Sequence, residues 1–478
     1  MSKAVLFFSS VLMITFLACD SPKTDYRQQI DDEIRRGNFT AAKQIINSAL
    51  KKTSPEEKVQ LRFVEDSLHR VELDFRRTKN EIVDWIEKNR GFIPSDSLLN
   101  EWEKSKSLEF RIIDGEKRYF KNAAPNIFRV DAAARELSKI PAPKSDTPRD
   151  SLLIDAFKNK TSTDIKGKYL LPKKTVRVHY TITVNADAAA DGETLYAWLP
   201  FPRKDIQRQS DVKLLATSQP DYVLSEGQAQ HNSVYMEQKT QKGKPTVFSI
   251  DFEVSSHGEW FDLSEIKVDE YDRSSYLFRA YTSERKPQIQ FSDNIKKLTD
   301  SVTQNAGTPI ESLQAIYRYI AANYPWASAL EYSTIPNIPE YVIENRKGDC
   351  GQVALLLITM LRYKGIPARW QSGWMTHPGE VNLHDWAEVY FEGTGWIPVD
   401  ISFGRDGAVP IKPSREFFMS GIDSYRLYVN SDYSGKFYPR KKYPRSETVD
   451  FQRGEVETKN WNLYFDEWNY KMEVEYLN

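Results

Sequence analysis

The first third of the chain carries apolar residues at helical spacing, set among many charged ones. Ser54-Pro55-Glu56-Glu57 has the pattern of a capping box with proline at the first helical position, which predicts the start of a helix. Apolar residues follow with the helical period, at Leu61, Val64, Leu68 and Val71. Further helices are predicted over residues 74–88, 97–109 and 131–139.

We therefore expect residues 19–166 to form a helical domain that acts as a spacer or a docking unit. The stretch 37–50 is similar to one repeat of a helical hairpin, but no period recurs, so the sequence does not predict a repeat array. Prolines indicate a linker near the end of this domain, at Pro141, Pro143 and Pro148.

From about Tyr169 the hydrophobic period changes from that of a helix to that of a strand. Apolar residues alternate strictly with polar ones over 176–184. Similar short strands are predicted over 195–199, 246–254 and 276–281, separated by turn-rich loops. Several strands with one apolar face favour an antiparallel β-sandwich over residues 167–294. His179 falls on the opposite face of its strand, where we expect a solvated side chain.

Helical and strand patterns alternate again from residue 295, which predicts an α+β core over 295–405. Thr308-Pro309-Ile310-Glu311 is a second capping box and predicts a helix after it. The apolar run 353–361 predicts a buried helix that ends at Gly365 and Pro367. Residues 406–478 are rich in aromatic side chains, which either add strands to this core or shape a substrate groove. The whole chain is thus predicted to be a multidomain α+β protein.

The first residues have the pattern of a removable leader. Lys3 supplies a positive charge, and residues 4–17 form an uncharged, mostly apolar stretch that is short for a membrane span. Leu17-Ala18-Cys19 then predicts cleavage after residue 18, and it resembles the lipobox of bacterial lipoproteins. The resemblance implies a lipid on Cys19 and an exported protein anchored to a membrane of the bacterial envelope, on its periplasmic or surface face. A plain secretory signal is the alternative.

Composition excludes some classes of function. The 66 Lys+Arg and 67 Asp+Glu nearly cancel, so no global field favours nucleic acid. The chain has two cysteines, Cys19 and Cys350. If Cys19 carries lipid, Cys350 has no partner for a disulfide and is a free thiol. His69, His231 and His257 have no neighbours at metal-ligand spacing, so we expect neither a metal nor a cofactor.

Cys350 is predicted to lie in the first turn of the buried helix. Free N–H groups and the positive end of the helix dipole lie there, and both favour a thiolate; the same N–H groups are candidate donors to an oxyanion. A thiolate needs a base, and the base needs a residue that orients it. His384 lies on a predicted strand, and the turn at Gly393-Thr394-Gly395 leads to a second strand that ends at Asp400. Such a hairpin brings Asp400 near His384, whereas the rival base His377 lies in a Thr-His-Pro loop.

These elements resemble the transglutaminase-like superfamily. Its pattern combines a G-x-C that opens a helix, an R-x-x-G-I-P-A-R-type helix end, an H-x-W-x-E-V strand and a G-W-x-x-x-D strand. All four occur in order, in residues 348–350, 362–369, 384–389 and 395–400. The resemblance covers about residues 308–403 and implies that Cys350 is the nucleophile, His384 the general base and acid, and Asp400 the residue that orients His384. The upstream sandwich also looks like the N-terminal module of bacterial members.

The resemblance also implies an upstream side chain, aromatic or amide-bearing, that helps to stabilise the oxyanion. Three residues of the corresponding stretch qualify, and no motif selects one: Trp326, Tyr332 and Asn337. Candidate residues of the substrate groove are Trp326, Tyr332, Gln352 and Trp386.

The mechanism implied is attack of the Cys350 thiolate on an amide carbonyl, which gives a thioester that water or a second amine resolves. Water makes the protein a peptidase or amidase, and an amine makes it a protein-glutamine cross-linking acyltransferase. We expect hydrolysis of a protein or peptide substrate, peptidoglycan and glycopeptides included. A non-catalytic module that binds envelope polymers or proteins is the alternative of another class, and the complete triad argues against it.

Overall fold

The computed structural model describes residues 26–140, 149–227, 229–405 and 416–477. Helices come first and several antiparallel sheets follow, which confirms the predicted α+β class. The chain divides into two compact units, residues 1–144 with 326–341 and residues 145–325 with 342–478. The predicted leader, Cys19 and the linker prolines lie outside the described residues.

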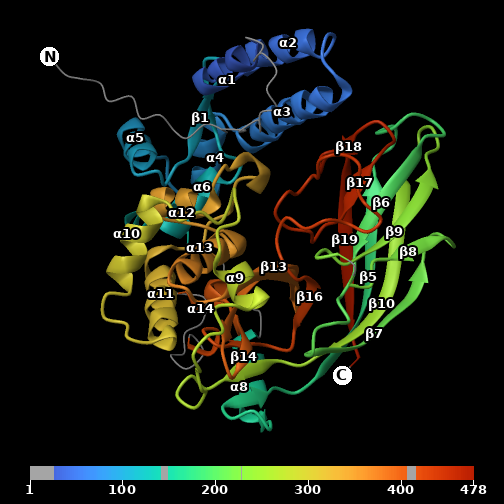
Figure 1. The fold of residues 1–478 in the computed structure, drawn as a ribbon. Coiled ribbons are helices and arrows are strands. Elements are labelled where there is room, and N and C mark those ends of the chain that lie inside the picture. Colours follow the sequence, from blue (N-terminus) through green and yellow to red (C-terminus); the bar gives the residue numbers. More distant parts are fainter. Residues whose placement is uncertain (1–25, 141–148, 228, 406–415, 478) are drawn as a thin grey trace. The chain divides into compact units, whose positions relative to one another are not determined.

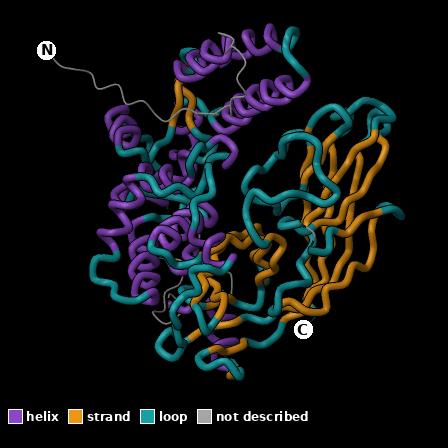
Figure 2. The backbone as a smooth tube through the Cα atoms, viewed as in Figure 1, coloured by secondary structure: helices purple, strands orange, loops and turns teal. Residues whose placement is uncertain are grey.

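The first unit consists of packed helices and one short β-hairpin, drawn purple and orange in Figure 2. Its longest helix begins as predicted, since the Ser54 side chain accepts a hydrogen bond from the Glu57 N–H at 3.3 Å and Pro55 is the first helical residue. The elements are α1(Tyr26–Arg36), α2(Phe39–Ala49), α3(Pro55–Asp74), α4(Lys79–Arg90), α5(Asp96–Lys104), β1(Phe110–Ile113), β2(Glu116–Tyr119), α6(Ala123–Val130) and α7(Ala132–Leu137).

A segment from far along the sequence, residues 326–341, completes this helical unit. Asn126 and Ser328 exchange two hydrogen bonds, with the Asn126 amide donating to the Ser328 carbonyl at 3.0 Å and the Ser328 N–H donating back at 2.9 Å. The buried carboxylate of Asp74 accepts from the Glu331 N–H at 2.7 Å. The helical region therefore holds the stretch that precedes Cys350. Its elements are η1(Tyr332–Thr334) and the start of α12(Ile338–Asn345).

In the second unit, two antiparallel sheets pack together as the predicted sandwich (Figure 1), with strand orders β19-β5-β10-β7 and β18-β17-β6-β9-β8. The predicted alternation is confirmed in β5, where five side chains from Val176 to Val184 are at most 3% exposed. Burial of each valine or isoleucine contributes about 1.5–3 kcal/mol. The strands are β5(Lys174–Val184), β6(Thr194–Pro200), β7(Gln209–Thr217), β8(Tyr222–Leu224), β9(Ser233–Lys239), β10(Thr246–Ser256), β17(Glu455–Glu457), β18(Asn462–Leu463) and β19(Trp468–Tyr476).

A third sheet, with strand order β14-β13-β12-β16, carries the candidate catalytic strands, and α13 packs on β12 and β13. Two of the helices beside this sheet, α11 and α13, begin at capping boxes. Thr308 and Glu311 form the first, and Asp349 and Gln352 form the second. The elements are α9(Tyr276–Thr282), α10(Asp293–Val302), α11(Pro309–Asn323), α13(Cys350–Tyr363), β12(Ala368–His377), β13(Glu380–Phe391), β14(Gly395–Val399), α14(Ile401–Gly404) and β16(Arg426–Asn430).

A small fourth sheet, with strand order β15-β11-β4-β3, closes this unit beside a short helix. An apolar cluster joins that helix to the rest through Leu153, Leu171 and Phe403. The elements are α8(Arg149–Lys158), β3(Thr161–Ser162), β4(Lys168–Leu170), β11(Glu259–Phe261) and β15(Gly421–Ile422).

The sandwich and the catalytic sheet share one hydrophobic core. Trp374 of β12 lies in the sandwich core and stacks on Tyr180, with ring centroids 5.3 Å apart. Strands β12 and β16 approach so closely that a Cβ on Gly373 would lie 1.9 Å from the Leu427 carbonyl oxygen, so this position requires glycine. The ranges 167–294 and 295–405, which we predicted as separate domains, therefore form one compact unit.

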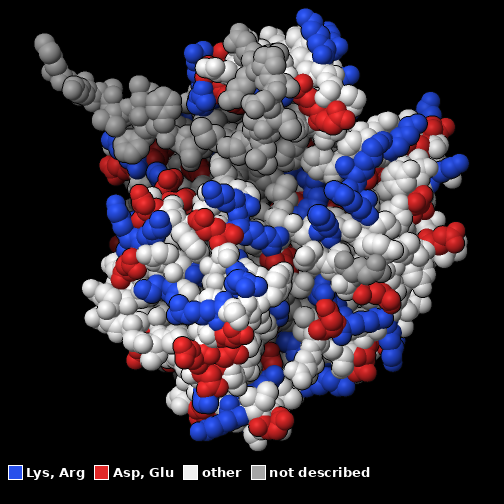
Figure 3. Space-filling model, in the orientation of Figure 1, with Lys and Arg blue, Asp and Glu red and all other residues white. Residues whose placement is uncertain are grey.

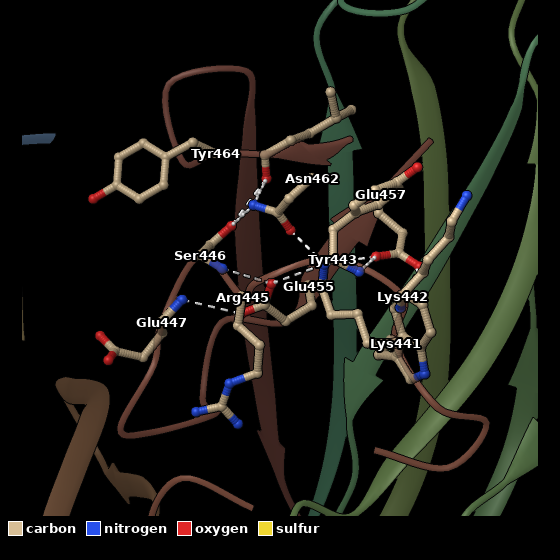
Figure 4. Close-up of polar contacts among 12 residues, drawn as sticks. Lys441, Lys442, Tyr443, Arg445, Ser446, Glu447, Glu455, Glu457, Asn462 and Tyr464 are labelled. Atoms are coloured by element: carbon tan, nitrogen blue, oxygen red, sulfur yellow. Dashed lines mark hydrogen bonds and ion pairs between the residues drawn. The ribbon is translucent and has the colours of Figure 1, made fainter. Parts of the chain in front are cut away.

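Between β16 and β17 the chain makes a long excursion that a buried ionic network fixes (Figure 4). The Lys441 ammonium contacts Glu457 at 2.9 Å and Asn462 at 2.5 Å, and Glu455 lies 3.8 Å away. The two glutamates of β17 also accept backbone N–H groups of residues 442–447. These bonds tie the excursion to the sandwich, and its last residues, 449–454, are thereby set against the catalytic sheet.

Other expectations were wrong. Residues 276–281 form helix α9 and no strand, because Ser275 caps the segment by accepting from the Phe278 N–H at 3.0 Å. Helix α5 ends at Lys104, ahead of the predicted 109, and strand β1 follows. The helical unit does not extend to residue 166, because α8 and β3 pack in the second unit.

The predicted extension 406–478 is shared between two sheets. Strand β16 pairs with β12 of the catalytic sheet, whereas β17, β18 and β19 join the sandwich. In Figure 1 the red strand β19 lies beside the green β5, with which it pairs along 468–476. The last part of the chain therefore contributes strands both to the catalytic sheet and to the sandwich.

On the surface, Lys and Arg are interspersed with Asp and Glu over the face drawn in Figure 3. His179 lies on the outer face of β5 as expected, 42% exposed and paired with Asp251 at 2.8 Å. Across the described residues, no helix combines the length and the apolar character that crossing a membrane requires.

Candidate active site

Cys350 is the first residue of α13. The N-cap Asp349 accepts from the Gln352 N–H at 3.0 Å, and Asp349 N–H donates back to the Gln352 side chain at 3.3 Å. The buried Arg405 braces the preceding loop by donating to the carbonyls of Gly348 and Asp349 at 2.8 and 3.0 Å. Cys350 as a whole residue is half-buried at the start of this helix.

His384 and Asp400 meet as the predicted hairpin requires. Strands β13 and β14 pair antiparallel around the turn at residues 392–394, which leaves Asp400 at the end of β14. His384 Nε2 lies 2.7 Å from Asp400 Oδ2, and both side chains are buried. The edge of Phe403 packs against the imidazole, with ring centroids 4.8 Å apart. The carboxylate therefore fixes the imidazole orientation and leaves Nδ1 for other chemistry.

The Cys350 thiol contacts the residue next to His384. Its sulfur donates to Asp385 Oδ2 at 3.4 Å. Within the described chain, no hydrogen bond links Cys350 to His384. The structure thus brings together a cysteine at a helix start and a carboxylate-bound histidine, with the thiol held one strand position away from the base.

Comparison with known proteins agrees with this arrangement. The profile of the transglutaminase-like superfamily matches residues 296–401, which contain α11, α13, the β12–β14 sheet and all three predicted triad residues. Residues 296–401 form a transglutaminase-like domain. Members of this superfamily are typically cysteine enzymes.

Individual relatives match more distantly. The uncharacterised Bacillus subtilis protein YebA is 26% identical over 164 residues, which cover 30% of this chain and 21% of that protein. A proposed cysteine protease of Cytophaga hutchinsonii aligns over 65% of this chain and 93% of its own, with a TM-score of 0.43 and 16% identity. The periplasmic domain of TgpA from Pseudomonas aeruginosa aligns over 46% of this chain and 93% of its own, with a TM-score of 0.23 and 15% identity.

In the transglutaminase-like domain the surroundings of Cys350 disfavour the thiolate, contrary to our expectation from the helix start. Burial raises the pKa of Cys350 well above its ordinary value, and Asp385 and Asp349 raise it further. The Asp349 carboxylate caps the N-terminus of α13, so a negative charge offsets the positive end of the helix. Burial also lowers the pKa of His384, against the opposing effect of Asp400. Both shifts favour the neutral forms of the two side chains.

Two residues of the C-terminal excursion hold Asp385. Gln452 donates to Asp385 Oδ1 at 2.8 Å and to the His384 carbonyl at 2.7 Å. Asp450 is hydrogen-bonded to Asp385 and also accepts from Ser372 at 2.5 Å. Burial and the neighbouring Asp450 raise the pKa of Asp385 well above that of an exposed carboxyl group. Asp385 and Asp450 therefore form a buried pair of carboxyl groups beside the thiol.

A chain of alternating charges runs behind His384. Arg426, fully buried, donates to Asp400 at 2.8 Å and to Asp423 at 3.1 Å, and Asp423 lies 3.1 Å from His377. Burial opposes ionisation of Asp400, but His384 and Arg426 outweigh it and lower its pKa. His377 ends strand β12, so it is not the loop residue we expected, and it pairs with Asp423 instead of Asp400.

The candidate groove residues divide into two groups. Gln352 and Trp386 are each 1% exposed, because Gln352 closes the capping box of α13 and Trp386 packs against Tyr428. Neither can line an open groove, so that expectation was wrong for both. Trp326 and Tyr332, with the third oxyanion candidate Asn337, belong to the segment held by the helical unit.

Sequence reasoning missed Asp385, Arg405, Arg426, Asp450 and Gln452. Asp385 was visible beside His384, but strand alternation placed it on the other face. The other four lie outside the four-part motif, and no spacing signals them. Among the described residues, no group of three or more His, Cys, Asp or Glu side chains is placed to hold a metal ion.

Replacing Asp385 by asparagine should lower the pKa of the Cys350 thiol, because a neutral amide of the same shape no longer disfavours the thiolate. The rate of alkylation by iodoacetamide, followed by mass spectrometry from pH 5 to 10, should rise at lower pH than in the wild type.

Asp251→Asn, which removes a surface carboxylate, is the matched control and should leave the pH profile unchanged. A slower reaction at every pH in Asp385→Asn would contradict this reading, since it would mean that the carboxyl group activates the thiol.

Replacing Arg426 by methionine should lower the free energy of unfolding at pH 7 by about 3 kcal/mol, because it leaves two buried carboxylates without their cation. The lowered pKa of Asp400 means that its pairing stabilises the fold above the ordinary carboxyl pKa and is lost as the pH falls through the lowered value. In the variant both carboxyls take up protons more readily, so the loss should be smaller at pH 4.5.

Urea denaturation at the two pH values measures this difference. Arg318→Met, which breaks an exposed pair with Glu416, should cost less than about 1 kcal/mol at either pH. An equal loss at both pH values for Arg426→Met would attribute its role to packing on Phe403, 3.8 Å from the guanidinium, instead of charge.

Proposed function

We propose that this protein is a cysteine-nucleophile hydrolase that cleaves an amide bond through a thioester intermediate. The observation that carries the proposal is the buried 2.7 Å contact between His384 and Asp400. It lies on the sheet against which the helix that begins at Cys350 packs. A buried imidazole oriented by a carboxylate, beside a thiol at a helix start, is the arrangement that acyl transfer through sulfur needs.

The reaction begins when the Cys350 side chain turns from Asp385 toward His384. His384 Nδ1 takes the thiol proton while sulfur attacks the amide carbonyl. The resulting oxyanion accepts hydrogen bonds from the N–H groups of Cys350 and Gly351. These two N–H groups are free because they lie before the first hydrogen bond within the helix. Collapse of this tetrahedral intermediate breaks the C–N bond and leaves the thioester, and the imidazolium gives its proton to the leaving amine. Water, deprotonated by His384, then cleaves the thioester to a carboxylic acid and the free thiol.

Asp400 holds the imidazole and stabilises the imidazolium that forms during both steps. A second amine in place of water would make the product a new amide, so acyl transfer differs only in the second nucleophile. The choice depends on access of water and amine to the thioester, and we propose hydrolysis, on a protein, peptide or glycopeptide substrate.

The test incubates the full chain with a peptide library and follows new products by mass spectrometry, with and without added cadaverine. Cys350→Ala should abolish product formation, and His384→Ala should reduce its rate by about a hundredfold or more. Hydrolysed products would support our proposal, whereas cadaverine adducts would assign acyl transfer.

His377→Ala is the matched control, because it removes another buried histidine that is paired with an aspartate. It should retain a rate within about tenfold of the wild type. Equal losses in the two histidine variants, or products that persist in Cys350→Ala, would overturn the assignment, and a protein without products would bring forward the role of a binding module.

We further propose that the enzyme acts from a membrane of the bacterial envelope, as a lipoprotein anchored through Cys19. The support is the leader pattern of residues 1–18 and the Leu17-Ala18-Cys19 junction. Replacement of Cys19 by serine should move the protein from the membrane fraction to the soluble fraction of a bacterial host that is fed a labelled fatty acid, and it should abolish the label. A labelled Cys19→Ser protein would contradict the anchor.

A further inference from the structure

A cavity of about 470 Å³ lies in the second unit, away from Cys350. Its wall includes four arginines and one carboxylate: Arg203, Arg285, Arg362, Arg369 and Asp432. Arg362 occupies the last turn of α13, the helix that Cys350 begins, so the two sites are about 18 Å apart along that helix at 1.5 Å per residue. The cavity is therefore separate from the candidate active site.

Four different segments supply these arginines. Arg203 follows β6, Arg285 follows α9, Arg362 ends α13 and Arg369 begins β12. Aromatic rings hold three of the guanidinium groups in place, with Tyr433 4.2 Å from Arg285, Tyr281 5.5 Å from Arg362 and Trp396 4.1 Å from Arg369. The cations are thus oriented before any ligand arrives.

Several guanidinium N–H groups on this wall have no hydrogen-bond partner among the described residues. Arg203 uses all three nitrogens, on Asp205 and on the carbonyls of residues 229 and 230. Arg362 donates from Nε and Nη1 to three backbone carbonyls, and within the described residues its Nη2 has no partner although the side chain is buried. Arg369 Nη1 and Arg285 Nε are likewise without partners in the described chain.

The arginines on this wall also outnumber the carboxylates that pair with them. Asp205, Asp432 and Glu388 each pair with one arginine, Arg203, Arg285 and Arg369 respectively. Arg362 forms no ion pair in the part of the chain that is described, and burial lowers the pKa of its guanidinium, although the nearby Asp432 carboxylate opposes this effect. A buried cation bound only to carbonyl groups is costly unless an anion compensates it. The wall therefore has one uncompensated charge and several free N–H groups, which together favour an oxyanion.

We propose that this cavity binds a small molecule that carries a phosphoryl group. The unused donors come from three different segments, and a tetrahedral phosphate accepts hydrogen bonds from several directions, whereas a planar carboxylate matches one guanidinium fork. The volume lies within the range of small-ligand pockets, so the ligand extends beyond the phosphate. Tyr276, also on the wall, is 80% exposed and offers a flat face for a ring.

Inorganic pyrophosphate is the probe, titrated calorimetrically into the full chain at fixed ionic strength. Saturable binding is expected for the wild type and for Cys350→Ala, since the cavity does not depend on the proposed hydrolase chemistry. Arg285→Gln should weaken binding about tenfold or more through loss of a charge-assisted donor. Ala280→Glu, which places a carboxylate on the wall, should abolish binding.

Arg177→Gln is the matched control, because Arg177 is a surface arginine that also pairs with a carboxylate, Glu253 at 2.6 Å. Its affinity for pyrophosphate should equal that of the wild type, and thermal melts establish that each variant is folded. Absence of saturable binding would overturn the proposal. Equal weakening in Arg177→Gln would reduce it to general surface charge, and citrate binding as tight as pyrophosphate would reject the phosphoryl specificity.

Discussion

The buried carboxylate of Asp400 is the constraint on which the catalytic side of this molecule depends. It accepts from His384 and Arg426, and through its other oxygen it caps α14 by accepting from the Phe403 N–H. An ionised carboxylate can be buried only if cations and donors surround it. Strand β14, helix α14 and strand β16 must therefore meet at this residue, and their meeting sets the orientation of the imidazole.

The order of the chain shows how this meeting is achieved. Arg426 begins β16, which pairs with β12 on the side away from β13. The excursion after β16 is fixed by Lys441 between the carboxylates of β17 (Figure 4). It returns Asp450 and Gln452 to the strand that carries His384. The last strands then join the sandwich. Sandwich and catalytic sheet are thus one cooperative core, joined by Trp374.

The electrostatics of Cys350 illustrate a competition between a helix start and its capping residue. The dipole and free N–H groups of α13 favour a thiolate, but burial and the carboxyl groups of Asp385 and Asp349 prevail. The thiol donates to Asp385, so part of the shift in its pKa comes from that contact.

The sequence by itself determined what local rules control: the capping boxes at Ser54 and Thr308, the alternation of β5, the buried helix after Cys350, and the hairpin whose register brings His384 to Asp400. Those features depend on neighbours within a few residues or on one turn. Only the tertiary structure placed Arg426 and Gln452 at the site, grouped Arg203, Arg285 and Arg362 around one cavity, and assigned residues 326–341 to the helical unit. These contacts join segments up to hundreds of residues apart, where no periodicity or spacing relates the partners, and the packing of whole sheets decides which side chains meet.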